Sequence, residues 1–195
     1  MKKFIGLMLA MLILMMFTGC NGEGKVKQGR TIAFDKEKGL VIFIEDKSLI
    51  KGKPDYTILP PSVFAIPKDK QEMGGDPAVG QRMKLDVEKN TITIFDKTTQ
   101  QFNEIPFTLI EKKDNVAKED PLVKGKKYPI VDRTAKTIQI YSSRLKTYVS
   151  FSLPVEYFAL PDETWAAGDE IRIYYKEEGK SLRFMNITKT DIFKK

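Results

Sequence analysis

Two short phrases of the sequence resemble each other: LPPSVFAIP at Leu59–Pro67 and LPVEYFALP at Leu153–Pro161, about ninety residues apart. Both begin with Leu-Pro, carry Phe-Ala near the end and finish in proline. Proline lacks the N–H that a central strand uses in its ladder, so paired prolines bracket a short edge strand. We therefore expect a strand at 63–66 and a matching strand in the second phrase, with Phe64 and Phe158 filling the core at a corner. A ligand groove lined by these aromatic rings is the alternative.

The similarity continues on both sides of the two phrases. Upstream, IAFDKEKGLVIFIED aligns with PIVDRTAKTIQIYSS, so that Asp35 falls on Asp132. Downstream, after a six-residue insertion in the first copy, Gly80 falls on Gly168. Because three blocks keep their register with small gaps between them, we interpret the chain as a tandem duplication.

Strand signals recur in both copies. Polar and apolar residues alternate, or β-branched residues accumulate, in the runs 82–87, 91–95, 137–141 and 170–175. Gly39, Asn90 and Gly179 stand where the chain should turn back. These patterns predict an all-β fold: two tandem, duplicated small β-barrel or sandwich modules after an N-terminal signal helix.

The expected division of the chain follows from these patterns. It consists of a signal peptide at 1–19, a flexible tether at 20–28, a first β module at 29–110, a linker at 111–124 and a second β module at 125–195. The tether is rich in glycine, and the linker is charged, contains proline and shows no periodicity.

One predicted strand, GLVIFIE at 39–45, is apolar on both faces. A strand that is buried on both sides needs a second cover. We therefore expect Leu40, Ile42 and Ile44 to pack against the other module or against a strand at 105–110.

The first twenty residues, MKKFIGLMLAMLILMMFTGC, have the features of an export signal. Two lysines precede an unbroken apolar run, Phe4 to Phe17, which is too short for an ordinary membrane span. The ending Phe17-Thr18-Gly19-Cys20 resembles the lipobox of bacterial lipoproteins, although that family usually places Leu where this chain has Phe17. The alternative is an unreactive thiol at the end of an uncleaved anchor.

The lipobox resemblance implies an address as well as a modification. Cys20 would be the lipid attachment residue, carrying acyl chains such as palmitate and anchoring the chain to a bacterial membrane on its non-cytoplasmic side. Asn21, rather than Asp, follows the cysteine, which slightly favours the outer membrane if the cell has one. Lys25, Lys27 and Arg30 would then either lean on anionic headgroups or belong to a solvated tether.

Composition excludes several kinds of site. The chain has 195 residues, no histidine and one cysteine, so a His-dependent triad, a Cys–His pair, a Cys/His zinc site and an internal disulfide are all impossible within it. GGDPAVG at 74–80 is Gly-rich but lacks the GK[ST] ending and the following helix of a phosphate-binding loop. We predict no catalytic, cofactor-binding or metal-binding residue and no cofactor.

The carboxylates fit solvated turns better than a catalytic pair. Glu37, Glu177 and Glu178 lie beside lysines, and Asp35 and Asp132 occupy equivalent turn positions, where Asp commonly bonds its own backbone. A carboxylate-based hydrolase is accordingly the less favoured alternative, because it needs two carboxyl groups in one cleft.

The basic residues suggest modest affinity for anions. The formal net charge is +7, and the basic residues are scattered, with KGKK at 124–127 and Lys194-Lys195 at the end. Nucleic-acid binding conflicts with the export signal, so an anionic envelope polymer or an envelope protein is the expected partner. Trp165 is expected to anchor its loop rather than to form a sugar-stacking platform.

These observations predict a membrane-anchored envelope lipoprotein that is not an enzyme and acts as a binding or assembly component. In plan the chain is similar to uncharacterised lipoprotein families of unknown function. The alternative is a carrier or receptor module that holds a small ligand or glycan between the two modules.

Overall fold

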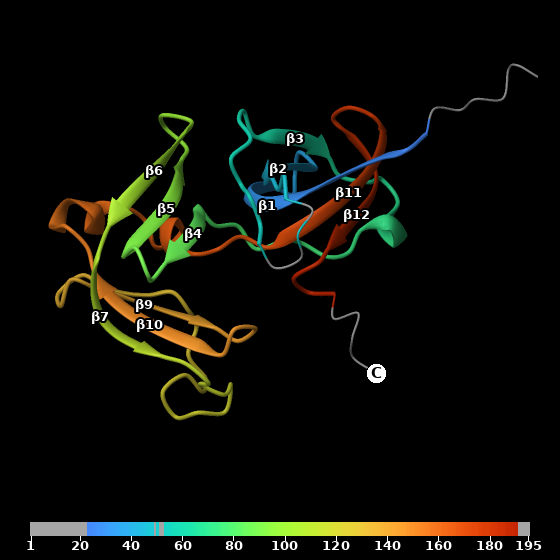
Figure 1. Cartoon of the computed structure of the whole chain (residues 1–195). Helices are drawn as coiled ribbons and strands as arrows, with labels where there is room; N and C mark the ends of the chain where they lie inside the picture. Colours follow the sequence, from blue (N-terminus) through green and yellow to red (C-terminus); the bar gives the residue numbers. More distant parts are fainter. Residues whose placement is uncertain (1–22, 49, 51–52, 191–195) are drawn as a thin grey trace, which may run out of the picture.

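The computed structural model describes residues 23–48, 50 and 53–190 and confirms the all-β class (Figure 1). The expected signal peptide and Cys20 lie outside the described residues. Within the described part of the chain, no helix is long and apolar enough to cross a membrane.

The elements follow one another along the chain as strands joined mostly by tight turns. They are β1 (Lys25–Asp35), β2 (Leu40–Glu45), β3 (Ser62–Ala65), β4 (Arg82–Asp86), β5 (Thr91–Asp96), β6 (Gln101–Pro106), β7 (Thr108–Lys113), β8 (Ile130–Asp132), β9 (Thr137–Ser142), β10 (Thr147–Ser152), β11 (Glu170–Glu177) and β12 (Lys180–Asn186). Three short 3-10 helices are interspersed: η1 (Lys70–Glu72), η2 (Val155–Ala159) and η3 (Asp162–Trp165).

Five strands form the first unit, a closed barrel in the order β1-β11-β12-β3-β2. Its core contains Val41, Phe43, Phe64, Ile171, Ile173, Tyr175 and Phe184. Strand β1 pairs with β2 on one side and with β11 on the other, both antiparallel. The barrel therefore joins the beginning of the described chain to its end.

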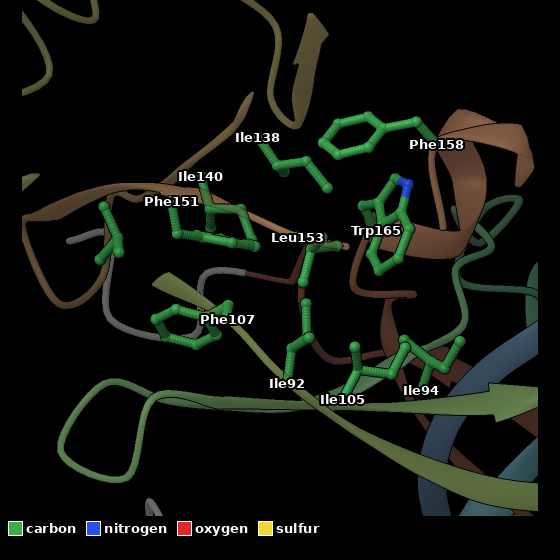
Figure 2. Close-up of a cluster of buried hydrophobic side chains, with 11 residues drawn as sticks. Ile92, Ile94, Ile105, Phe107, Ile138, Ile140, Phe151, Leu153, Phe158 and Trp165 are labelled. Atoms are coloured by element: carbon green, nitrogen blue, oxygen red, sulfur yellow. The ribbon is translucent and has the colours of Figure 1, made fainter. Parts of the chain in front are cut away.

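The second unit, which we call the sandwich, contains the intervening strands. One sheet has the order β7-β10-β9-β8 and the other the order β4-β5-β6. Inward-facing side chains of both sheets share one core with Phe158 and Trp165 (Figure 2). Strands β6 and β7 follow each other directly, and buried Phe107 stands between them.

The pairing of the strands corrects the expected division into tandem modules. The boundaries 29–110 and 125–195 do not separate the barrel from the sandwich, because β1 pairs with β11 and β7 pairs with β10. In the sequence alignment the hairpin β1–β2 matches β8–β9, and the hairpin β4–β5 matches β11–β12. Each unit thus combines the first hairpin of one sequence copy with the second hairpin of the other.

The matched first hairpins turn in the same way. Asp35 accepts a hydrogen bond from the backbone N–H of Lys38 at 2.9 Å. Asp132 accepts from the N–H groups of Thr134 at 2.9 Å and Ala135 at 2.8 Å. The turns end in residues with positive φ, Gly39 at 64° and Lys136 at 56°. The predicted role of the two aspartates in their own turns is confirmed.

Two other expected boundaries are wrong. Residues 25–28 of the expected tether lie in β1, paired with β11, because backbone ladder bonds need no apolar side chains. The expected linker at 111–124 begins inside β7 and continues into a loop that folds onto the sandwich. Val116 and Val123 of that loop are buried against Tyr148, so it does not connect separate modules.

The two phrases bracketed by proline adopt different structures. The first contains strand β3, as predicted, but the second forms the 3-10 helix η2 rather than a strand. Phe64 is fully buried in the barrel core, whereas Phe158 is buried in the sandwich core. Both rings fill a core, as expected, but Phe64 does so from a strand and Phe158 from a 3-10 helix.

The strand with two apolar faces does have a second cover. Ile44 is fully buried with Met83 and Phe95, and Ile42 packs against the same cluster. The cover comes from β4 and β5 of the sandwich, not from 105–110. This apolar contact joins the two units.

Candidate functional site at the junction of the two units

Two segments of the chain cross where the barrel meets the sandwich. The N–H of Gly80 donates to the carbonyl of Thr31 at 3.3 Å, and the N–H of Thr31 donates to that of Asp169 at 3.0 Å. The N–H of Asp169 in turn donates to the carbonyl of Ala78 at 2.9 Å. A short network of backbone bonds therefore fixes the position of one unit on the other.

The two glycines that match in the duplication meet at this crossing. A Cβ atom on Gly80 would lie 2.3 Å from the carbonyl oxygen of Ala166, and one on Gly168 would lie 1.8 Å from that of Thr31. Both distances are far below van der Waals contact, and the atoms approached belong to the backbone. Glycine is required at both positions for the segments to approach so closely.

Beside the crossing, Arg30 of β1 reaches from the barrel to the sandwich. Its guanidinium donates to the carbonyl of Arg82 at 3.1 Å and to that of Met83 at 2.8 Å. The same group lies 4.5 Å from the ring centre of Tyr56 and 3.6 Å from a carboxylate oxygen of Glu170. Only 14% of the Arg30 side chain is exposed, so its charge is held in a poorly solvated place.

Tyr56 and Glu170 form the other side of this cluster. The Tyr56 hydroxyl donates to the Glu170 carboxylate at 2.9 Å. Burial raises the pKa of Tyr56 well above its ordinary value, and the nearby Glu170 carboxylate raises it further, although Arg30 opposes this shift. The phenol is therefore a hydrogen-bond donor and not a base at neutral pH.

Arg82 of β4 brings a second guanidinium to the junction. Its Nε donates to the carbonyl of Trp165 at 2.9 Å. Burial lowers the pKa of Arg82 to about 10, and the like charge of Arg30 contributes to the shift. Among the described residues no carboxylate lies within ion-pair distance of Arg82. Of the two guanidinium groups, only that of Arg30 has a carboxylate, Glu170, within ion-pair distance in the described part of the chain.

Several polar atoms of the junction are buried without a hydrogen-bond partner in the described part of the structure. They are Arg30 Nε, Thr31 Oγ1, Thr164 Oγ1 and Trp165 Nε1. Buried polar groups without partners are uncommon in folded proteins. Two of these atoms belong to Arg30 and its neighbour Thr31, and the other two belong to Thr164 and Trp165, whose backbone carbonyl binds Arg82. The arrangement can bind an anion such as a carboxylate or a phosphate, for which guanidinium groups are well suited.

The sequence gives little indication of this site. Arg30 was expected to lie near headgroups or in a tether, and Arg82 and Tyr56 were not singled out. The four residues that form the cluster are far apart in the chain, and no motif connects them. The alternation of β4 indicates which residues share a face, but not that this face meets Arg30.

Residues that the sequence did single out have structural roles here. Trp165 is fully buried in the sandwich core, so an exposed sugar-stacking platform at this position is ruled out. Lys27 pairs with Glu178 at 2.7 Å and with Glu45 at 3.4 Å. Glu177 pairs with Lys180 at 2.8 Å. No cluster of three or more possible metal ligands occurs in the part of the chain that the structure describes.

A pocket of about 410 Å³ lies at the bend between β6 and β7. It is lined by Pro106, Phe107, Thr108, Ser152, Leu153 and Pro154. None of these side chains carries a charge, so the junction offers more chemistry for a ligand than this pocket does.

Comparison with known proteins identifies a family. Residues 22–195 match the family described as Domain of unknown function (DUF4881), which covers all of the described structure. Neither the curated proteins nor the solved structures gave a match. Since the match extends over far more than half of the sequence, the chain belongs to the DUF4881 family.

Proposed function

We propose that the protein is a bacterial envelope lipoprotein, anchored through Cys20, that acts as a non-catalytic binding or assembly component. The observation that carries the proposal is the position of Cys20 after a charged and apolar leader and directly before the folded part of the chain. The family match begins at residue 22, and β1 begins at Lys25.

The short connection between Cys20 and β1 has a physical consequence for the proposal. Five residue steps separate Cys20 from Lys25. An extended chain covers about 3.3–3.6 Å per residue, so the barrel would begin within about 18 Å of the lipidated residue. Each buried methylene of an acyl chain contributes about 0.8 kcal/mol, so two or three chains would hold the barrel at the bilayer surface.

A binding or assembly role suits the polar groups of the structure. Several charged side chains at the barrel surface form ion pairs, such as Lys36 with Asp76 at 2.7 Å and Arg183 with Glu72. At the junction, backbone hydrogen bonds and the bonds of the Arg30 guanidinium to the carbonyls of Arg82 and Met83 hold the two units together. These features favour a protein that presents a binding surface rather than an enzyme that converts a substrate.

The anchor is tested by fractionation and intact-protein mass spectrometry in a bacterial host. The wild-type chain is expected in the membrane fraction, without residues 1–19 and with acyl chains on Cys20. Cys20→Ala is expected to lose the acyl mass and to retain the leader. Gly22→Ala is the matched control and should behave as the wild type. A free thiol on a chain that still begins at Met1 would overturn the proposal.

A second candidate is a carrier for a small anion held at the junction. Arg30 and Arg82 favour it, because the Arg30 guanidinium contacts the backbone of Arg82, whose own side chain has no carboxylate partner among the described residues. Inorganic phosphate and acetate are the probes, with binding measured by calorimetry. Arg82→Gln should weaken binding at least tenfold.

Arg172→Gln is the control for this second candidate, since Arg172 is an exposed arginine of the barrel whose side chain donates to Gln28 at 2.9 Å. Equal binding by the wild type and Arg82→Gln, or no binding of either probe, would rule the carrier function out. Thermal unfolding of both variants shows whether they remain folded.

A further inference from the structure

The positive charge of the protein is concentrated at one end of the sandwich. Residues 111–127 and 143–146, which we call the basic tip, hold eight Lys or Arg and four Asp or Glu. The other described residues hold twenty Lys or Arg and twenty-one Asp or Glu. The excess positive charge of the described chain therefore lies entirely in the basic tip.

Most cations of the basic tip are free to interact with a partner. Lys112 pairs with Asp114 at 2.8 Å, and Lys113 pairs with Glu111 at 2.9 Å. The other basic side chains are exposed and have no ion-pair partner among the described residues: Lys118, Lys124, Lys126, Lys127, Arg144 and Lys146.

An apolar side chain projects from the same end. Leu145 lies in the turn between β9 and β10 with 68% of its surface exposed, the largest fraction among the large hydrophobic residues that the structure describes. Its neighbours in the turn are Arg144 and Lys146. An exposed leucine between two cations combines apolar insertion with attraction to anionic headgroups, as in proteins that bind the surface of a bilayer.

The loop and the turn are fixed to each other by a small core of their own. Val116, Val123 and Tyr148 are buried, and Tyr128 and Tyr141 pack against them. The N–H of Val116 donates to the carbonyl of Lys146 at 2.8 Å, and the Tyr141 hydroxyl donates to the carbonyl of Val116 at 3.0 Å. The cations of the loop therefore stand beside Leu145 in a defined arrangement.

The basic tip lies far from the expected anchor. Figure 1 shows the loop between β7 and β8 at the lower end of the sandwich, whereas β1 begins on the opposite side of the molecule, at the upper right. A lipid on Cys20 and a bilayer at the basic tip would therefore be on opposite sides of the protein.

We infer that the basic tip binds the surface of an anionic lipid bilayer, with Leu145 entering the headgroup region and the free cations contacting lipid phosphates. This binding goes beyond the proposed lipid anchor, and together the two would let the protein connect two membranes. A lipid surface explains both the charge and the exposed leucine, whereas an anionic polymer explains only the charge.

The test uses the full lipidated protein inserted into neutral phosphatidylcholine vesicles. Flotation with these vesicles first establishes the anchor, so that failure of the anchor and failure of the basic tip are distinguished. Anionic vesicles with about one third phosphatidylglycerol are then added, and vesicle connection is followed by energy transfer between lipid dyes. We expect connection with anionic but not with neutral acceptor vesicles, weakening as salt rises.

Two variants separate charge from apolar insertion. The triple variant Lys124→Gln, Lys126→Gln and Lys127→Gln should weaken vesicle binding roughly a hundredfold, since each cation near an anionic surface contributes about a fivefold factor. Leu145→Ser should weaken it roughly tenfold, through loss of apolar burial.

Matched controls remove the same groups elsewhere. Lys68→Gln, Lys89→Gln and Lys176→Gln together remove three exposed cations, and Val155→Ser removes a hydrophobic side chain that is 64% exposed. Both controls should bind anionic vesicles as the wild type does. Binding that is unchanged in the triple variant would overturn the inference. Polyphosphate is the probe for an anionic polymer. If the protein binds polyphosphate, Leu145→Ser does not weaken this binding and no vesicles are connected, the partner is an anionic polymer and the inference is overturned.

Discussion

Gly80 and Gly168 lie where the segments that join the barrel and the sandwich cross. Because a Cβ on either would meet a backbone oxygen within 2.3 Å, neither segment can make room by moving a side chain. Gly80→Ala and Gly168→Ala are each expected to lower the free energy of unfolding by about 3 kcal/mol, the upper range for overpacked sites. Urea unfolding followed by tryptophan fluorescence measures the change.

Gly125→Ala is the control for these two substitutions. Gly125 has φ at 72° and nothing near the position of a Cβ, so alanine there should cost only about 1 kcal/mol of backbone strain. If Gly80→Ala and Gly168→Ala cost no more than Gly125→Ala, the close approach is not a constraint on the fold.

Tyr56 makes the stability of the junction depend on pH. Its pKa is raised in the folded protein, so the associated stability is complete below the ordinary value of 10.0 and is lost as pH rises above it. Tyr56→Phe should lower the free energy of unfolding by about 2 kcal/mol at pH 8, because a hydrogen bond to a carboxylate is lost. At pH 11 this difference should shrink by about 1.4 kcal/mol, since only the wild type loses stability through Tyr56.

Urea midpoints of wild type and Tyr56→Phe at pH 8, 10 and 11 test this expectation. The other tyrosines are common to both proteins, so the comparison isolates Tyr56. A difference in stability that stays constant from pH 8 to pH 11 would contradict the assignment of a raised pKa to this residue.

At the scale of elements, the barrel closes through very few contacts. Strand β12 pairs with β3 through Lys180 and Ala65, the N–H of Ala65 donates to the carbonyl of Gly179 at 2.8 Å, and the Ser181 hydroxyl donates to the carbonyl of Ala65. Ser181→Ala should therefore speed amide exchange in β3 about fivefold, which corresponds to one lost hydrogen bond of about 1 kcal/mol.

Hydrogen exchange read by mass spectrometry or NMR checks this closure. Ser150→Ala is the control, because Ser150 is a buried serine of β10 in the sandwich and should leave β3 unchanged. Faster exchange throughout the barrel, rather than in β3, would show that Ser181 stabilises the whole unit and not its closure.

At the scale of the whole molecule, the sandwich is continuous in sequence and the barrel is not. Strands β4 to β10 and the helices that complete the sandwich core lie within residues 80–167. This fragment should fold alone with a cooperative urea transition. Fragments 29–110 and 125–195 should not, because each lacks several strands of both units. Circular dichroism and urea titration of the three fragments test this, and cooperative unfolding of 29–110 would contradict the strand exchange.

The sequence alone predicted most of the local structure. Alternation placed β4, β5, β9 and β11, glycine and asparagine marked the turns at Gly39 and Asn90, and Asp35 and Asp132 take the predicted turn bonds. These features depend on residues close together in the chain, so their patterns are visible in a single sequence. The helix η2 was missed because its prolines suit a strand boundary and a 3-10 turn equally well.

Only the tertiary structure decided which strands pair and which residues meet. Antiparallel pairing depends on backbone groups that every strand carries, so β1 accepts β11 as readily as it would accept a strand of its own sequence copy. The exchange of hairpins then brings Arg30 of β1 to Arg82 of β4 and Glu170 of β11. A repeat in the sequence specifies matching pieces, whereas burial of Ile44, Met83 and Phe95 between the units decides how those pieces assemble.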